Sequence, residues 1–133
     1  MIKTKKGSFW DFILDITEEE FIRMNLTPLE ASLLIDRSIC RCNYYGQEIK
    51  LSKESIEVLY ILAEAKGRII STKDLTEKLN YMDPNTLNKR IKRLNEQFKK
   101  INSTNCKKIV LNERKIGYKL NTDIIDTYRL WLV

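Results

Sequence analysis

The amino-acid sequence predicts an α+β fold: a core of three helices and a C-terminal β-hairpin, preceded by a short N-terminal helical segment and another β-hairpin. The first observation behind this is a regular helical repeat of apolar residues over 84–101. The second is a set of helix-capping residues that divides 51–83 into two further helices. The third is a pair of short runs with β-strand character, 107–112 and 118–121, joined by a turn.

Length and composition favour one soluble domain with short extensions. Of 133 residues, 43% are hydrophobic and 32% are charged, which is enough for a buried core and too apolar for a disordered chain. No stretch approaches the roughly 20 apolar residues that a membrane span needs, so we expect no membrane partner. Residues 1–16 imitate a signal peptide, but Asp11 and Asp15 interrupt the apolar part, so we expect a mature cytoplasmic protein.

The N-terminal third predicts helices followed by a hairpin. Apolar residues recur at helical spacing within 8–16, and residues 17–20 (TEEE) have the pattern of a capping box that opens a second short helix. Pro28 ends this helical segment, and Tyr45-Gly46 marks a turn between strands. The strands are expected at 33–35, 37–43 and 47–51.

Capping residues define the first two helices of the core. Ser52 is placed to cap the first helix, and Gly67 stands where a helix commonly ends. After a brief extended piece at 69–70, Ser71 caps the second helix, which continues to about Leu79. The inward apolar residues are Ile56, Leu59, Tyr60 and Ala63 in the first helix, and Leu75 and Leu79 in the second.

The third helix is the strongest feature of the sequence. Asp83 caps it, and Pro84 takes the first helical position, where its missing N–H costs nothing. An apolar stripe follows, formed by Leu87, Ile91, Leu94, Phe98 and Ile101. At about 100° per residue, the opposite face carries Asn85, Lys89, Lys92 and Glu96, with Arg93 and Lys100 on one flank and Asn88 and Lys99 on the other.

Basic charge is concentrated in the C-terminal part of the chain. The net charge is +6 overall, −1 over residues 1–50 and +7 over 51–133. Residues 84–120 hold eleven Lys or Arg and two Glu, a local net charge of +9. Such an excess is typical of a site for a polyanion. A basic run taken alone is more often a solvated surface, so the interpretation depends on the helix that carries it.

The sequence offers little material for catalysis or metal binding. It contains no histidine, which removes the commonest general base, and it has no phosphate-binding loop or nucleophile motif. Three cysteines, Cys40, Cys42 and Cys106, cannot by themselves complete a four-ligand zinc site. We interpret Cys40 and Cys42 as small apolar residues on one face of a strand. We expect no enzyme, no metal, no cofactor and no small-molecule substrate.

The order of the elements is that of a winged helix-turn-helix. In this arrangement the second helix braces the third, whose polar face can enter the DNA major groove. Asn side chains can read adenine there, and Lys or Arg can read guanine or contact phosphate. The hairpin over 107–121 is expected to act as the wing and to reach the DNA backbone or the minor groove. Its cations are Lys107, Lys108, Arg114, Lys115 and Lys119.

Residues 49–120 resemble the DNA-binding effector domain of the OmpR/PhoB response-regulator class. The resemblance is carried by the stretches LSKESIEVLYILAEAKGRIISTKDL, NTLNKRIKRLN and ERKIGYKL. It implies that Arg114 enters or lines the minor groove, and that Gly117 and Tyr118 shape the wing. It also implies base or phosphate contacts from Asn85, Asn88, Lys89, Arg90, Lys92 and Arg93. The expected function is therefore sequence-specific binding of double-stranded DNA by a bacterial transcriptional regulator.

Three departures from the family pattern matter. The loop between the second and third helices is shorter and lacks the usual Trp-Gly, so the resemblance does not extend to activation through that loop. Lys115 replaces the first wing glycine, which predicts a different turn. Residues 1–36 are too few for a receiver domain, so phosphorylation within the chain is not the expected switch.

The ends of the chain leave partner and function partly open. We divide it into an N-terminal helical extension (1–36), the winged helix-turn-helix (37–121) and an apolar tail (122–133). Both ends can complete a monomeric core or pack against a second copy, and a homodimer would match two DNA half-sites. Two other functions remain open: a winged-helix adaptor for protein–protein interaction, and a plasmid or phage replication or partition factor.

Overall fold

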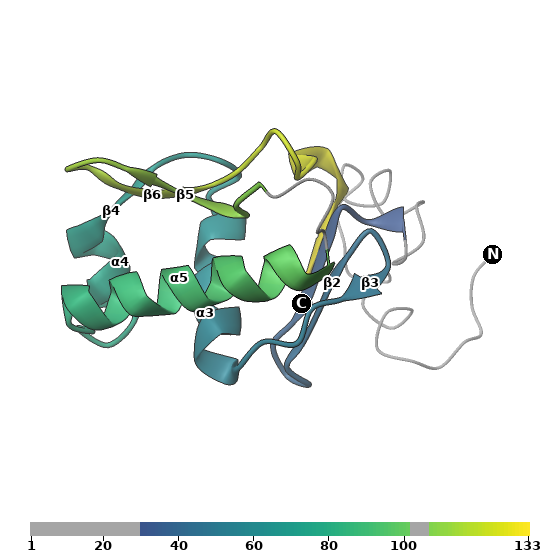
Figure 1. The fold of residues 1–133 in the computed structure, drawn as a ribbon, viewed down its shortest axis with the longest axis horizontal. Helices are drawn as coiled ribbons and strands as arrows, with labels where there is room; N and C mark the ends of the chain where they lie inside the picture. Colours follow the sequence, from purple (N-terminus) through teal and green to yellow (C-terminus); the bar gives the residue numbers. More distant parts are fainter. Residues whose placement is uncertain (1–29, 102–106) are drawn as a thin grey trace.

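The computed structural model describes residues 30–101 and 107–133 (Figure 1). The predicted helical segment over 8–25 and Cys106 lie outside these residues. The elements in chain order are β1 (Leu33–Asp36), β2 (Arg41–Tyr44), β3 (Gln47–Glu48), α3 (Lys53–Glu64), β4 (Ile70–Ser71), α4 (Thr72–Lys78), α5 (Pro84–Ile101), β5 (Val110–Glu113), β6 (Gly117–Leu120), the 3₁₀ turn η2 (Thr127–Arg129) and β7 (Leu130–Leu132). Three helices followed by a hairpin confirm the predicted α+β winged helix-turn-helix.

All three helices begin at the predicted capping residues. The hydroxyls of Ser52 and Ser71 each accept a hydrogen bond from the backbone N–H three residues later, at 3.2 and 3.1 Å. The Asp83 carboxylate accepts from two N–H groups in the first turn of α5, at 2.9 and 3.3 Å. These bonds satisfy donors that a helix leaves unpaired at its start. After α3, Lys66 and Gly67 both take left-handed φ values, 54° and 92°, which turns the chain away from the helix axis.

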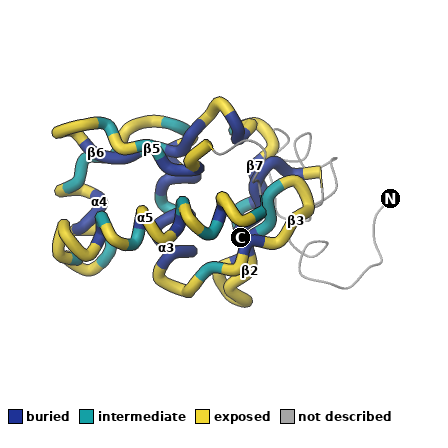
Figure 2. The backbone as a smooth tube through the Cα atoms, viewed as in Figure 1, coloured by how far each residue is buried: buried dark blue, intermediate teal, exposed yellow. Residues whose placement is uncertain are grey.

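The core lies where the helices and both sheets meet, as the buried positions in Figure 2 show. The buried residues of α5 are Leu87, Ile91, Leu94 and Phe98. Helix α3 buries more than its predicted stripe, because it packs on α5, β6 and β7; Val58 and Leu62 are fully enclosed as well. No helix within the described ranges combines the length and the apolar composition that crossing a lipid bilayer requires.

Three strands form the wing sheet, in the order β4-β6-β5. The β5–β6 hairpin is antiparallel and pairs Glu113 with Gly117 beside its turn. Gly117 lies so close to β4 that a Cβ atom would overlap the carbonyl oxygen of Ile70, so only glycine fits there. The predicted strand over 107–112 starts later, at Val110. Ile109 and Val110 are both buried, because Ile109 precedes the strand and does not follow its alternation.

A four-stranded sheet, in the order β3-β2-β1-β7, lies beside the C-terminal end of α5 (Figure 1). The prediction of a strand over 37–43 is wrong for 37–40, which form a turn. There the Asp36 carboxylate accepts hydrogen bonds from the N–H and the hydroxyl of Ser38, at 3.0 and 2.7 Å. Cys40 lies in this turn, exposed and with a φ of 52°, whereas Cys42 is buried in β2. The two cysteines therefore do not share one face of a strand.

The C-terminal tail supplies the fourth strand of this sheet, β7. This role of the tail was not predicted from the sequence. Strand β7 pairs parallel to β1 and places Trp131 opposite Leu34. The Val133 N–H donates to the Ile35 carbonyl at 2.8 Å. Leu34 and Trp131 belong, with Ala31, to a second apolar cluster separate from the main core. Strands from all three predicted parts of the chain, which meet at 36/37 and 121/122, thus belong to one sheet. The division into three parts stays a prediction.

Candidate nucleic-acid interface

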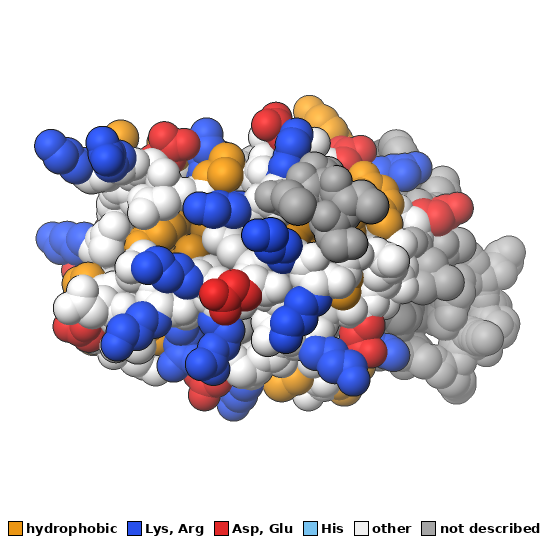
Figure 3. Space-filling view, in the orientation of Figure 1, with side chains coloured by type: hydrophobic (Ala, Val, Ile, Leu, Met, Phe, Trp, Pro, Cys, Tyr) orange, Lys and Arg blue, Asp and Glu red, His pale blue; other side chains and the backbone are white. Residues whose placement is uncertain are grey.

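The polar face of α5 is open to solvent. Its buried stripe turns the other side of the helix outward, so that Asn85, Lys89, Lys92 and Arg93 are exposed. Lys and Arg side chains gather on this side of the molecule, along α5 and at the end of the wing (Figure 3). The 18 residues of α5 give a length of about 27 Å, which exceeds the roughly 12 Å width of the DNA major groove.

Two other predicted residues of α5 lie at the margins of this face. Asn88 is half-buried, and its Oδ1 accepts a hydrogen bond from the Tyr118 hydroxyl at 3.4 Å. Burial raises the pKa of Tyr118, so the phenol keeps the proton that it donates. Arg90 lies on the opposite flank, with Nη1 3.7 Å from the Glu54 carboxylate of α3. Hydrogen bonding with the backbone lowers the pKa of Glu54, and the Arg90 cation lowers it further.

Asn95 fixes the wing to α5, a role that the sequence pattern does not reveal. Its side-chain NH₂ donates to the Val110 carbonyl at 3.1 Å, and its Oδ1 accepts from the Val110 N–H at 3.0 Å. This pair of bonds joins the middle of α5 to the first residue of β5. An amide matches a backbone peptide group in this way because it offers one donor side and one acceptor side. An Asn beside an apolar stripe carries no sequence signal that singles out such a partner.

The wing tip presents two cations. Arg114 and Lys115 are exposed in the turn between β5 and β6, which lies toward the N-terminal end of α5 (Figure 1). Lys115 has a φ of 64°, so its backbone takes the left-handed conformation that glycine favours. The Ile116 carbonyl accepts a hydrogen bond from the Thr72 N–H at 3.2 Å, which anchors the tip to the start of α4.

Lysines also surround the base of the wing. Lys107 and Lys108, exposed just before β5, and Lys92 and Lys99 of α5 line a hollow of about 240 Å³. Asn95 and Glu96 complete its lining, and we refer to these six residues as the wing-base hollow. Neither of the two ion pairs found within the described ranges includes one of its lysines. The second of those pairs joins Lys119 to Glu113 across the hairpin, at 3.2 Å.

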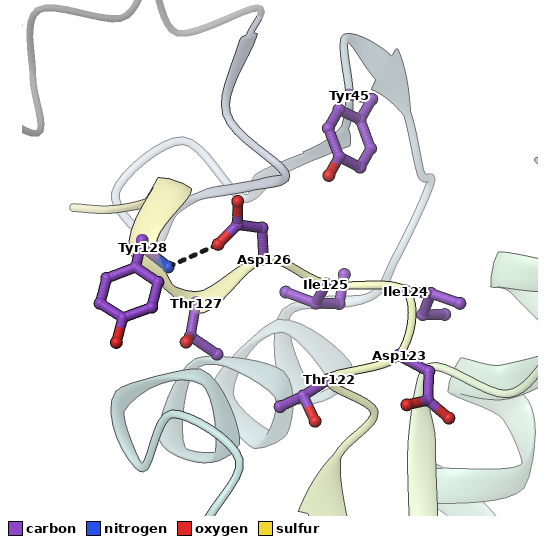
Figure 4. Close-up of a pocket in the computed structure, with 8 residues that line it drawn as sticks. All are labelled: Tyr45, Thr122, Asp123, Ile124, Ile125, Asp126, Thr127 and Tyr128. Carbon is purple, nitrogen blue, oxygen red and sulfur yellow. Dashed lines mark hydrogen bonds between the residues drawn. The ribbon is translucent and has the colours of Figure 1, made fainter.

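A larger hollow, of about 350 Å³, is lined by Tyr45 and by residues 122–128, none of which belongs to α5 or to the wing tip (Figure 4). Two carboxylates, those of Asp123 and Asp126, are among its lining groups, and Asp126 accepts a hydrogen bond from the Tyr128 N–H at 2.9 Å. Its acidic lining is unsuited to a polyanion. Among the described residues, no group of three or more His, Cys, Asp or Glu side chains could hold a metal ion.

Comparisons with known proteins agree with this geometry. The profile of a family described as "Transcriptional regulatory protein, C terminal" matches residues 46–120, more than half of the chain. Among solved structures, the chain is similar to the DNA-binding domain of E. coli CadC, with a TM-score of 0.59 and 22% identity, over 68% of this chain and 86% of that chain. A search of curated protein sequences returned no match. The chain belongs to the family of C-terminal domains of transcriptional regulatory proteins, the OmpR/PhoB-type effector domains that its sequence resembles.

Proposed function

We propose that this protein is a cytoplasmic bacterial transcriptional regulator that binds double-stranded DNA sequence-specifically, with α5 in the major groove and the β5–β6 hairpin as the wing. One observation carries the proposal: a long helix, fixed to the core by a buried stripe, exposes amide and cationic side chains on its other side. Membership of a family of transcriptional regulators supports it. We assign the protein binding and no catalytic step.

Base reading is assigned to the exposed face of α5 between Asn85 and Arg93. Asn85 has a free side-chain amide for adenine, and Lys89 and Arg93 present cations suited to guanine or phosphate. These residues lie on the side of the helix opposite the buried stripe, so a duplex can approach them without a change in the core. Docking of a preformed helix avoids the free-energy cost of ordering it on binding.

The remaining predicted residues are assigned to positioning. Arg114 at the wing tip is placed in or along the minor groove, with Lys115 beside it. Asn88, Arg90, Lys92 and Lys107 are assigned to the phosphate backbone, whose contacts fix the register of a protein on DNA without reading sequence. Asn88 and Arg90 already have partners in Tyr118 and Glu54, and these contacts hold their side chains at the edges of α5.

Selection of bound duplexes from a random pool tests the proposal. The expected result is an enriched motif, bound with an affinity that falls steeply as salt rises, because phosphate contacts release counterions. Absence of any enriched motif or salt-sensitive binding, with a protein captured instead, would contradict the proposal and favour an adaptor. We also propose that the protein binds DNA as a homodimer. Two half-sites about 10 base pairs apart in the selected motif would support a homodimer, and a single half-site would contradict it.

Two variants separate the proposed roles. Arg93→Ala should lower affinity for the selected duplex by about 1–3 kcal/mol and relax the choice of sequence. Lys107→Ala should weaken binding to selected and scrambled duplexes alike. Each variant serves as the control for the other, since both remove one exposed cation. Equal effects of the two variants on every duplex would contradict the assignment of roles.

A further inference from the structure

We propose that the wing-base hollow is a binding site for the sugar–phosphate backbone of a DNA duplex, and that it adds Lys99 and Lys108 to the cations that hold the DNA. This inference rests on the proposed function and deepens it. It assigns a phosphate strand to a place about two to four helical turns beyond Asn85, at the end of the wing opposite Arg114.

The chemistry of the hollow favours a phosphate ligand. Four lysines line it, and Glu96 is the one acidic side chain in its lining. The amide of Asn95 is engaged with the Val110 backbone on both its donor and its acceptor side, which leaves the lysines as the groups that can meet a ligand. Ammonium groups on flexible stems act as point charges, and they attract phosphate without selecting a base.

The position of the hollow fits a duplex that already contacts the tip of the wing. Arg114 lies six positions after Lys108, a span of up to about 20 Å when the chain is extended. The major and minor grooves together measure about 18 Å across. Cations at the two ends of the wing can therefore reach backbone strands on different sides of a groove. The Asn95 bonds attach the base of the wing to α5, and so they fix where the hollow lies along the helix.

If the hollow contacts the DNA backbone, removal of its lysines should change how DNA affinity depends on salt. It should not change which DNA sequence the protein prefers. The test variant is Lys99→Gln/Lys107→Gln/Lys108→Gln, and the matched control is Lys50→Gln/Lys66→Gln/Lys78→Gln. Both remove three exposed lysines, and the control lysines lie outside α5 and the wing hairpin. For each protein, the duplex association constant is measured from 50 to 200 mM salt on a selected and on a scrambled sequence. Thermal unfolding of both variants checks that they fold.

The test variant should show a slope of log K against log salt that is less steep by about 2–3, because each phosphate contact contributes about 0.9. The control should keep the wild-type slope to within about 1. The ratio of affinities for selected and scrambled duplexes should stay within about twofold of wild type in both variants. Equal slopes for the two variants, or loss of the affinity ratio in the test variant, would overturn this inference and leave the proposed function unaffected. A wild-type protein that binds no duplex would overturn the proposed function, and this inference with it.

Discussion

The two sheets of this molecule use their exposed surfaces differently. The wing sheet packs against α5 and extends a tip on which Arg114 and Lys115 are exposed. The four-stranded sheet has β7 as an edge strand and buries Trp131 in its own apolar cluster. A cation beside that sheet, Arg37, lies over the Tyr60 ring at 3.7 Å and so contacts the protein itself. The wing sheet is therefore suited to contact DNA, and the four-stranded sheet supports the fold.

Truncation of Trp131 should have the largest effect on stability and little effect on binding. Trp131→Ala removes a side chain that is only 4% exposed, so the free energy of unfolding should fall by about 3–5 kcal/mol. Below the melting temperature, affinity for a selected duplex should stay within about twofold, because β7 lies outside the proposed interface. Urea unfolding and DNA titration measure both. Tyr128→Ala, at a position that is 82% exposed, is the control and should change stability by less than about 0.5 kcal/mol. A large loss of affinity in folded Trp131→Ala would show that the four-stranded sheet also takes part in DNA binding.

Glycine replacements test how closely each sheet is packed. Gly117→Ala forces a Cβ onto the Ile70 carbonyl and should destabilise the protein by about 3 kcal/mol, with loss of the β4–β6 pairing. Gly46, in the turn between β2 and β3, has a φ of 86°. Gly46→Ala should cost only the left-handed backbone penalty, about 1–2 kcal/mol. Equilibrium unfolding of both variants gives the comparison, and similar losses would contradict the close approach inferred at Gly117.

Removal of the Asn95 amide should loosen the wing. Asn95→Leu leaves both polar groups of the Val110 backbone without their partner, which should cost about 2 kcal/mol. Hydrogen exchange at the Val110 N–H should accelerate, and DNA affinity should fall as the wing loses its fixed position. Gln97→Leu, on the other flank of α5, is the control. Unchanged exchange at Val110 would show that Asn95 does not hold the wing.

Lys115→Gly should move stability and binding in opposite directions. Glycine relieves the left-handed backbone at φ 64°, which should stabilise the hairpin by up to about 1 kcal/mol. The same change removes a cation from the wing tip, so DNA affinity should fall and depend less on salt. Thermal unfolding and titrations at two salt concentrations measure the two effects. Stability and affinity that both rise would contradict the assignment of Lys115 to DNA.

Cys40, in the turn before β2, and Cys42, within β2, should differ in their reactivity toward thiol reagents. Burial raises the pKa of the Cys42 thiol to about 12, so it stays protonated at pH 8 and is shielded from reagents. Cys40 is exposed in its turn. In a Cys106→Ser background, iodoacetamide at pH 8 should modify Cys40 and spare Cys42 until denaturant is added, as mass spectrometry of peptides can show. Equal rates for both thiols would contradict the turn at 37–40.

Local signals predicted the helical part of the fold well. Ser52, Ser71 and Asp83 each combine a capping side chain with a following apolar repeat, and each cap forms as predicted. The stripe that begins at Leu87 depends on period alone, so it also fixes which side of α5 faces outward. The open face of the candidate interface could therefore be predicted from the sequence.

Features that depend on distant partners could not be predicted. Strand β7 acquires its role from β1, about one hundred positions earlier in the chain, and the short run around Trp131 shows no period that distinguishes it from a tail. The turn at 37–40 was missed because the bonds of Asp36 to Ser38 outweigh the strand preference of the neighbouring apolar residues. The Asn95 bonds and the wing-base hollow likewise require α5 and β5 to be placed side by side.

Titration of a selected duplex into the isotope-labelled protein, followed by amide chemical shifts, would show which surface meets the DNA. We expect large changes along the exposed face of α5, at the wing tip around Arg114 and at Lys107 and Lys108, with residues of β1 and β7 little affected. Changes concentrated on the four-stranded sheet, with Asn85, Lys89 and Arg93 unaffected, would contradict the proposed interface.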